Sequence, residues 1–137
     1  MDSLLKSVVE NVSFHTRELG ATISVDDLPP CLADEPMANQ VFSNLIGNAL
    51  KYLDPQRTGD INVTGTVEGA NCVYCVCDNG IGIPDQCGER VFEIFHRLNP
   101  DDKNGGEGLG LTIVTRILDR LNGSIRLESK SGEGSKF

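Results

Sequence analysis

The sequence has no apolar run close to the roughly 20 residues that a membrane-spanning helix needs, and its amino terminus lacks a secretory signal. Basic residues are also scarce, because 12 Lys and Arg stand against 20 Asp and Glu and give a net charge of −8. Nucleic acids and anionic membranes are polyanions that select basic surfaces. These absences predict a soluble, cytoplasmic chain that contacts neither nucleic acid nor a membrane directly.

The cysteines do not form the pattern of a disulfide framework. There are five of them, an odd number, and no secretory context accompanies them, so reduced thiols are expected. Cys72, Cys75 and Cys77 lie together, but no second cysteine pair or nearby His completes a tetrahedral metal site. Because the cluster falls inside an apolar run with β-branched residues, packing in the core is favoured over metal binding.

The rest of the composition is that of an ordinary globular protein, with 39% hydrophobic and 23% charged residues in a chain of 137. A chain of this length forms about one domain around one core. Apolar periodicity predicts helices at residues 3–19, 34–53 and 109–121, and one or two short helices at 85–97. Strands are predicted through Ile23 and Val25 and at residues 60–68, 71–78, 123–129 and 135–137.

Two of these strands lead to further expectations. The strand at 71–78 carries apolar residues on both sides, which predicts that both of its faces are buried. The strand at 135–137 is too short for a natural last strand, so the chain is expected to be a fragment whose final strand is truncated.

The helix predicted at 34–53, with Asp34 as its N-cap, has a polar stripe. Asn44, Asn48, Lys51 and Tyr52 follow one another at spacings that place them on one side, while the other sides are apolar. A largely buried helix must turn such a stripe towards something polar. Hydrogen bonds from the asparagines to backbone groups in the core are the alternative explanation.

Two glycine-rich segments lie further along the chain. Asp78 ends a predicted strand and opens the turn DNGIGIP, in which Gly80 and Gly82 allow another molecule to approach the backbone. The segment GGEGLGL places glycines 106, 108 and 110 at the entry of a helix, where unpaired N–H groups and the helix dipole favour phosphate. Each segment alone is a common pattern, so the order of the segments carries the information.

Taken in order, N-x-x-x-N-x-x-K-Y, D-x-G-x-G-I, F-x-x-F-x-R (Phe92, Phe95, Arg97) and G-x-G-L-G-L resemble the N, G1, F and G2 boxes of the GHKL ATP-binding superfamily. The best match is the catalytic ATP-binding domain of two-component sensor histidine kinases, over residues 1–137. The resemblance implies an α/β fold of the Bergerat type, a two-layer α+β sandwich. Its sheet is mixed and mostly antiparallel, helices cover one face, and a flexible ATP lid lies at residues 99–107.

The resemblance also implies roles for the residues at the purine end of an ATP site. Asp78 would accept a hydrogen bond from the adenine amino group, and guanine would be rejected because it presents a carbonyl there. Gly80 and Gly82 would clear space for the base, Ile83 would pack on it, and Tyr52 would cover the adenine or the ribose.

At the phosphate end, the resemblance implies a cofactor, Mg²⁺, held by the side-chain oxygen of Asn48, with Asn44 supporting the metal or the phosphates. Lys51 would pair with a phosphate, and Arg97 is the candidate for the γ-phosphate, so that Asn44, Lys51 and Arg97 form the catalytic set. Backbone amides of the glycine-rich segment would wrap the triphosphate, from Gly106, Gly108, Leu109, Gly110 and Leu111.

The position of Asn44 separates the branches of the superfamily. Hydrolysing members and the anti-sigma-factor kinases carry a glutamate there as general base, whereas an asparagine cannot take a proton. A histidine acceptor is nucleophilic when neutral and needs no such base. The resemblance therefore implies a protein-histidine kinase domain that transfers the γ-phosphoryl group of ATP.

The acceptor histidine is expected on a separate dimerisation domain of the same parent, with a response regulator receiver domain downstream. His15 and His96 are interpreted as surface or lid-edge side chains, since SFHTREL lacks the proline of the family's acceptor motif. Two alternatives stay open: a nucleotide-binding or docking module without kinase activity, and a serine kinase or ATPase of the same superfamily.

Overall fold

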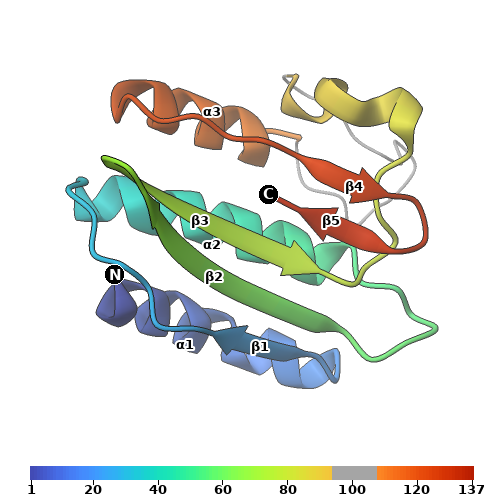
Figure 1. Cartoon of the computed structure of the whole chain (residues 1–137). Helices are drawn as coiled ribbons and strands as arrows, with labels where there is room; N and C mark the ends of the chain where they lie inside the picture. The colour runs from blue at the N-terminus through green and yellow to red at the C-terminus, as the bar shows by residue number, and fades with distance from the viewer. Residues whose placement is uncertain (94–107) are drawn as a thin grey trace.

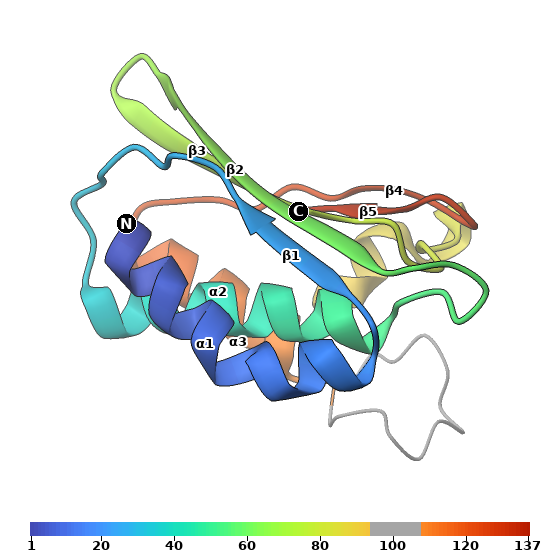
Figure 2. The ribbon, with the colours of Figure 1, turned by 90° about the horizontal axis from the view of Figure 1, so that it is seen from below.

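The computed structural model describes residues 1–93 and 108–137, which form a layer of helices packed on one face of a sheet (Figures 1 and 2). The helices are α1 (Asp2–Glu18), α2 (Glu35–Lys51), the 3₁₀ segment η1 (Asp85–Phe92) and α3 (Gly110–Arg120). The strands are β1 (Thr22–Val25), β2 (Asp60–Glu68), β3 (Asn71–Asp78), β4 (Glu128–Lys130) and β5 (Gly134–Lys136). The predicted two-layer α/β class is confirmed.

The sheet is mixed, as expected. Its strand order in the described residues is β1-β2-β3-β5-β4, where β1 runs parallel to β2 and the other neighbours are antiparallel. The pairs Cys77↔Lys136 and Asp78↔Ser135 join the end of β3 to β5. The last residues of the chain therefore lie beside Asp78.

The helix ends follow local chemistry. Asp34 caps α2, because its Oδ1 accepts a hydrogen bond of 3.0 Å from the backbone N–H of Met37. Asn122 ends α3 in a left-handed conformation with φ of 54°, and the N–H of Gly123 closes the turn on the carbonyl of Leu118. Helix α2 ends at Lys51, two residues before the predicted end, and the carbonyl of Tyr52 accepts the N–H of Ile81 instead.

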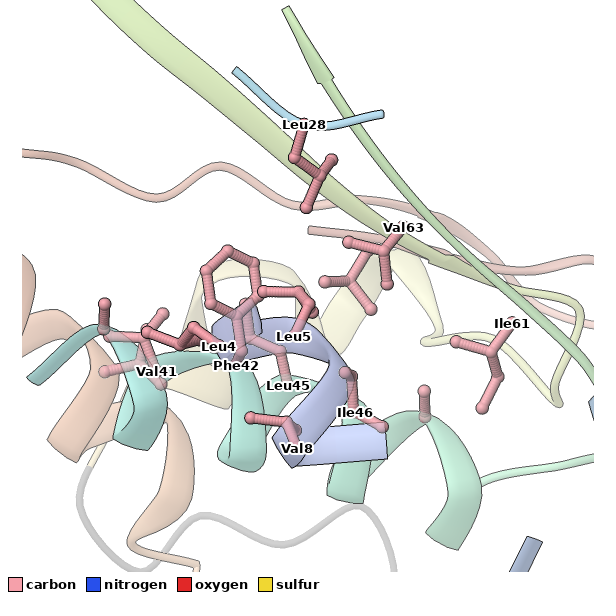
Figure 3. Packing of buried hydrophobic residues seen from close by; sticks show 14 of the residues in the cluster. Leu4, Leu5, Val8, Leu28, Val41, Phe42, Leu45, Ile46, Ile61 and Val63 are labelled. Carbon is pink, nitrogen blue, oxygen red and sulfur yellow. The ribbon is translucent and has the colours of Figure 1, made fainter. Parts of the chain in front are cut away.

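The core lies between the helices and the covered face of the sheet (Figure 3). Helix α2 is at its centre, and the residues predicted to form its apolar sides are all buried: Val41, Phe42, Leu45, Ile46, Ala49 and Leu50. They pack against Leu5 and Val8 of α1 and against Ile61 and Val63 of β2, which are at most 1% exposed. In the part of the chain that the structure describes, none of the helices is both long and apolar enough to cross a membrane.

The prediction that β3 is buried on both faces is wrong. Val76 is buried on the helix side, whereas Val73 on the other side is 42% exposed. Helices cover only one face of the sheet (Figure 2), so Cys75 and Cys77 on the uncovered face are only half-buried. Cys72 is also only half-buried, and none of the three cysteines belongs to the core, so the prediction that the cluster packs in the core is wrong as well. All five cysteines are free thiols.

Two elements differ from their predicted form. The strand expected at 123–129 is observed only as β4, because β5 offers partners only to Glu128, Ser129 and Lys130. The helix expected at 85–97 is a 3₁₀ segment interrupted by non-helical φ and ψ at Gly88. The end of that predicted helix, residues 94–97, lies outside the described residues.

Candidate functional site

The polar stripe of α2 faces the amino-terminal end of α3. The side-chain N–H of Asn44 donates a hydrogen bond of 2.8 Å to the carbonyl of Gln40, one turn earlier, which orients its amide. A side chain built on Gly110 would put its Cβ 3.1 Å from Oδ1 of Asn44 and 3.8 Å from Oδ1 of Asn48. The two asparagine oxygens and the start of α3 thus converge on one point, and a residue larger than glycine would intrude on it.

The start of α3 has the features of an anion site. Leu109 is the N-cap of α3, and no side chain of the described residues caps this end by a hydrogen bond. Gly108 precedes it with φ of 72°, a conformation that glycine adopts readily. Uncapped N–H groups and the positive end of the helix dipole favour negative charge. The structure thus brings Gly108, Leu109 and Gly110 beside the α2 stripe, while Gly106 lies outside the described residues.

Asp78 closes β3 at the other end of the site. Its Oδ1 accepts a hydrogen bond of 2.9 Å from the N–H of Gly80. Burial raises the pKa of the Asp78 carboxyl above its ordinary value, and backbone hydrogen bonds from Gly80 and Ser135 oppose this only in part. A half-buried carboxylate with a raised pKa is suited to accept a hydrogen bond from a ligand that replaces the lost water.

The turn after Asp78 packs tightly on the protein. A Cβ on Gly80 would collide with the carbonyl of Tyr52, and a Cβ on Gly82 with the carbonyl of Lys130. Gly82 also has φ of 70°. Backbone packing therefore explains both glycines, and the expectation that they clear space for a ligand stays a prediction.

The remaining candidate ligand-binding residues lie at the end of α2 and in the turn that follows β3. The ammonium of Lys51 stands 5.0 Å from the ring centroid of Tyr52, and both side chains are half-buried. Ile83 is 7% exposed.

His15 lies at the surface of α1, as expected. Its side chain is 59% exposed, and its Nδ1 is 3.9 Å from Oε2 of Glu18. Arg97, His96 and the predicted lid at 99–107 lie outside the described residues.

Sequence reasoning missed three residues that hold the Asp78 turn. Arg57, in the loop after α2, donates hydrogen bonds of 2.9 Å to the carbonyl of Gly80 and 2.6 Å to that of Gly132. Ser129 accepts the N–H of Ile83 at 2.8 Å, and its hydroxyl lies 2.8 Å from that of Ser135. Single polar residues in a loop or short strand carry no recognisable spacing, so no sequence signal could have found them.

Arg57→Ala is expected to loosen this turn. The change removes two charge-assisted hydrogen bonds, each contributing about 1.5–3 kcal/mol when buried and less at a half-exposed site. We expect a loss of about 1–2 kcal/mol in the free energy of unfolding and faster amide hydrogen exchange at residues 80–82. Arg126→Ala, which removes the same charge from an exposed position, is the control. Equal rates of amide hydrogen exchange at residues 80–82 in the two variants would show that Arg57 does not hold this turn.

Comparison with known proteins assigns the class. The family described as "Histidine kinase-, DNA gyrase B-, and HSP90-like ATPase" matches residues 33–137. The chain therefore belongs to this ATPase family, and the sequence-based recognition is confirmed.

Within the family, proteins named as sensor histidine kinases are among those similar to this chain. "Phytochrome-like protein Cph1" of Synechocystis is 38% identical over the whole of this chain and 18% of its own length. "Sensor-like histidine kinase SenX3" of Mycolicibacterium smegmatis is 36% identical over the whole chain and 36% of its own length. The chain thus spans between about a fifth and about a third of these relatives.

Solved structures agree with this assignment. Full-length ShkA, solved in complex with AMPPNP, superposes with a TM-score of 0.83 and 31% identity, over 98% of this chain and 28% of its own. The mycobacterial sensor histidine kinase MprB matches with a TM-score of 0.83 at 23% identity, over 99% of this chain and 91% of its own. The second likeness supports the fold alone. Together these findings confirm the Bergerat-type architecture expected from the sequence.

Proposed function

We propose that this chain is the catalytic domain of a sensor histidine kinase, which binds ATP with Mg²⁺ and transfers the γ-phosphoryl group to a histidine. The observation that carries the proposal is the convergence of the Asn44 and Asn48 oxygens on the uncapped start of α3. Oxygen ligands for a hard cation and N–H donors for phosphate are thereby side by side.

The arrangement along α2 supports an elongated nucleotide. From Asn44 to Tyr52 the helix rises about 12 Å, at about 1.5 Å per residue. The Asp78 turn meets the Tyr52 end, because the N–H of Ile81 donates to the carbonyl of Tyr52. The purine would lie at that end, with its amino group on Asp78 and its ring on Ile83, and the triphosphate would extend past Lys51 towards Asn48.

The residues present fit Mg²⁺. Asn48 offers a neutral oxygen at the point that only a glycine leaves open, and Asn44 stands beside it. The described residues contain no group of three or more His, Cys, Asp or Glu that could hold a metal, so phosphate oxygens and water would complete the ligand set, as Mg²⁺ prefers. When bound, Mg²⁺ neutralises phosphate charge. Lys51, the amides at the start of α3 and, in the undescribed segment, Arg97 would stabilise the transferred group.

An asparagine at position 44, where hydrolysing members of the superfamily carry a glutamate as general base, favours a histidine as the acceptor. The position one turn before Asn48 holds Asn44, whose amide nitrogen donates to Gln40 and cannot take a proton. Water and serine hydroxyls need a base, whereas neutral imidazole does not. We place the acceptor histidine on a separate dimerisation domain of the same parent kinase, in the cytoplasm. The receiver domain of a response regulator would accept the phosphoryl group next.

Nucleotide titration with transfer in trans tests the proposal. In calorimetry we expect ATP to bind more tightly with Mg²⁺ than with chelator, and GTP to bind at least about 10-fold more weakly than ATP. With γ-labelled ATP, label should pass to the parent's histidine-bearing domain, in an acid-labile form. Binding without transfer would favour the docking-module alternative, while fast ATP turnover by the chain alone would favour a serine kinase or ATPase. Failure to bind adenine nucleotide would refute the proposal.

A further inference from the structure

Two thiols lie side by side on the uncovered face of the sheet. Cys75 and Cys77 are alternate residues of β3, so their side chains point to the same side. Val76 between them is buried in the core, so the two thiols lie on the opposite side of the sheet, the face that the helices leave uncovered (Figure 2). Their sulfur atoms are 3.2 Å apart. Both side chains are half-buried rather than enclosed, so a small reagent can reach the pair.

The backbone opposes a direct disulfide between the two thiols. In a strand, alternate Cα atoms are about 6.7 Å apart, at the upper limit of about 6.8 Å for disulfides. Shortening β3 there would disturb the pairs Cys75↔Thr64 and Cys77↔Asn62 on one side and Cys77↔Lys136 on the other. The ladder on both sides thus holds the sulfurs apart.

A single bridging atom fits the pair better than a disulfide. Metal–thiolate bonds are about 2.3 Å long. Two bonds of this length reach across the observed 3.2 Å between the sulfurs when they meet at about 90° on the bridging atom, so such an atom needs no movement of the strand.

The small number of ligands near the two thiols limits which kind of ion can bind. A tetrahedral Zn²⁺ site needs three or four protein ligands, and no cluster of three or more His, Cys, Asp or Glu that could hold a metal is found in residues 1–93 and 108–137. The ammonium of Lys136, paired with Glu128 at 3.5 Å, opposes the raised pKa of the Cys75 thiol only in part, because burial and Cys77 raise that pKa more strongly. An occupant must therefore be thiophilic and satisfied by two sulfurs.

We propose that Cys75 and Cys77 form a dithiol site for a thiophilic ion of low coordination number, with trivalent arsenic as the best-fitting occupant. With an arylarsenic(III) oxide, two As–S bonds form and the bonds from arsenic to oxygen break. The two thiol protons leave with the oxygen as water, and no oxidation state changes. Burial and the neighbouring Cys77 raise the pKa of the Cys75 thiol to about 11, so its proton is present near neutral pH to be released in this way.

Phenylarsine oxide tests the site without any nucleotide, so the result is independent of the proposed kinase function. Native mass spectrometry should show one phenylarsenic group per chain, and Cys75 and Cys77 should be protected together from alkylation by iodoacetamide. Cys75→Ser or Cys77→Ser should weaken binding at least about 100-fold, because the second ligand acts at high effective concentration. Zn²⁺ alone should not compete at equimolar concentration.

The chain offers a matched control in its other thiols. Cys31 and Cys72 both approach the hydroxyl of Tyr74, and Cys31→Ser and Cys72→Ser should leave binding unchanged. Circular dichroism, together with the Cys75→Ala and Cys77→Ala variants, checks that lost binding is not lost folding. An adduct that survives the double change Cys75→Ser/Cys77→Ser, or one that disappears in Cys31→Ser, would overturn the proposal.

Discussion

Asp78→Asn should weaken ATP binding about 10- to 100-fold and, at the same time, stabilise the empty domain. A hydrogen bond from the adenine amino group to a carboxylate contributes about 1.5–3 kcal/mol, and an asparagine loses the charge and can present an N–H instead. In the protein without nucleotide, the ionised Asp78 carboxylate lowers the free energy of unfolding, because burial disfavours its charge and raises its pKa. We expect a rise of about 4 °C in Tm, which corresponds to about 1 kcal/mol in a domain of this size.

The pH dependence of stability separates this explanation from a general packing effect. A carboxyl whose folded pKa is raised above its ordinary value of 3.8 penalises the folded state when it ionises, so its cost appears as pH rises through the folded pKa. Below pH 3.8 both states bind the proton and the cost vanishes. The Tm difference between Asp78→Asn and the unaltered chain should therefore be near zero at the acid end and grow towards neutral pH.

Asp85→Asn is the matched control, since Asp85 is an exposed carboxylate in the first turn of η1. It should leave ATP affinity unchanged. The assignment of Asp78 fails if Asp78→Asn binds ATP as tightly as the unaltered chain. It also fails if the Tm difference is constant from pH 3 to pH 7.

Asn48→Ala should abolish the gain in ATP affinity that Mg²⁺ provides and lower the rate of phosphoryl transfer at least about 100-fold. The change removes one amide oxygen from the point where α2 meets the start of α3. Alanine is the best helix former, and Asn48 is only half-buried, so α2 should persist. Calorimetry with Mg²⁺ and with chelator, and label transfer to the histidine-bearing domain, measure the two effects.

Asn39→Ala is the control for this variant. Asn39 lies on the same helix, nine residues and therefore about half a turn away around the axis, and its Oδ1 lies 3.3 Å from the hydroxyl of Ser43. Affinity and transfer should be unaffected. A chelator-independent loss of affinity in Asn48→Ala would show that the amide contacts the nucleotide itself, and would contradict its role as a metal ligand.

Much of the candidate site was predictable because its parts are local. The spacing of Asn44, Asn48 and Lys51 follows from 3.6 residues per turn, and their half-buried position follows from the apolar residues around them. The strand that ends at Asp78 and the glycines around α3 could be recognised in the same way. The structure contributes the fact that these separate segments meet.

The hydrogen bonds that Arg57 and Ser129 make around the Asp78 turn were not predictable, since the residues that they join are remote in the chain. Arg57 reaches Gly80 and Gly132, which are 23 and 75 residues away, and Ser129 reaches Ile83 across 46 residues. Such contacts depend on how strands pair, which a period of two or 3.6 does not encode. The early end of α2 has the same origin, because Tyr52 leaves the helix to bind Ile81.

Short-range patterns were thus enough to place most helices and strands, the cap at Asp34, and the polar side of α2, because backbone geometry and side-chain alternation act over a few residues. They could not tell how many layers cover the sheet. Apolar residues on both sides of β3 predicted two covered faces, but α1, α2 and α3 pack on a single face of the sheet and leave Cys75 and Cys77 only half-buried. Long-range packing also brought the asparagine oxygens to the start of α3, where the proposed chemistry takes place.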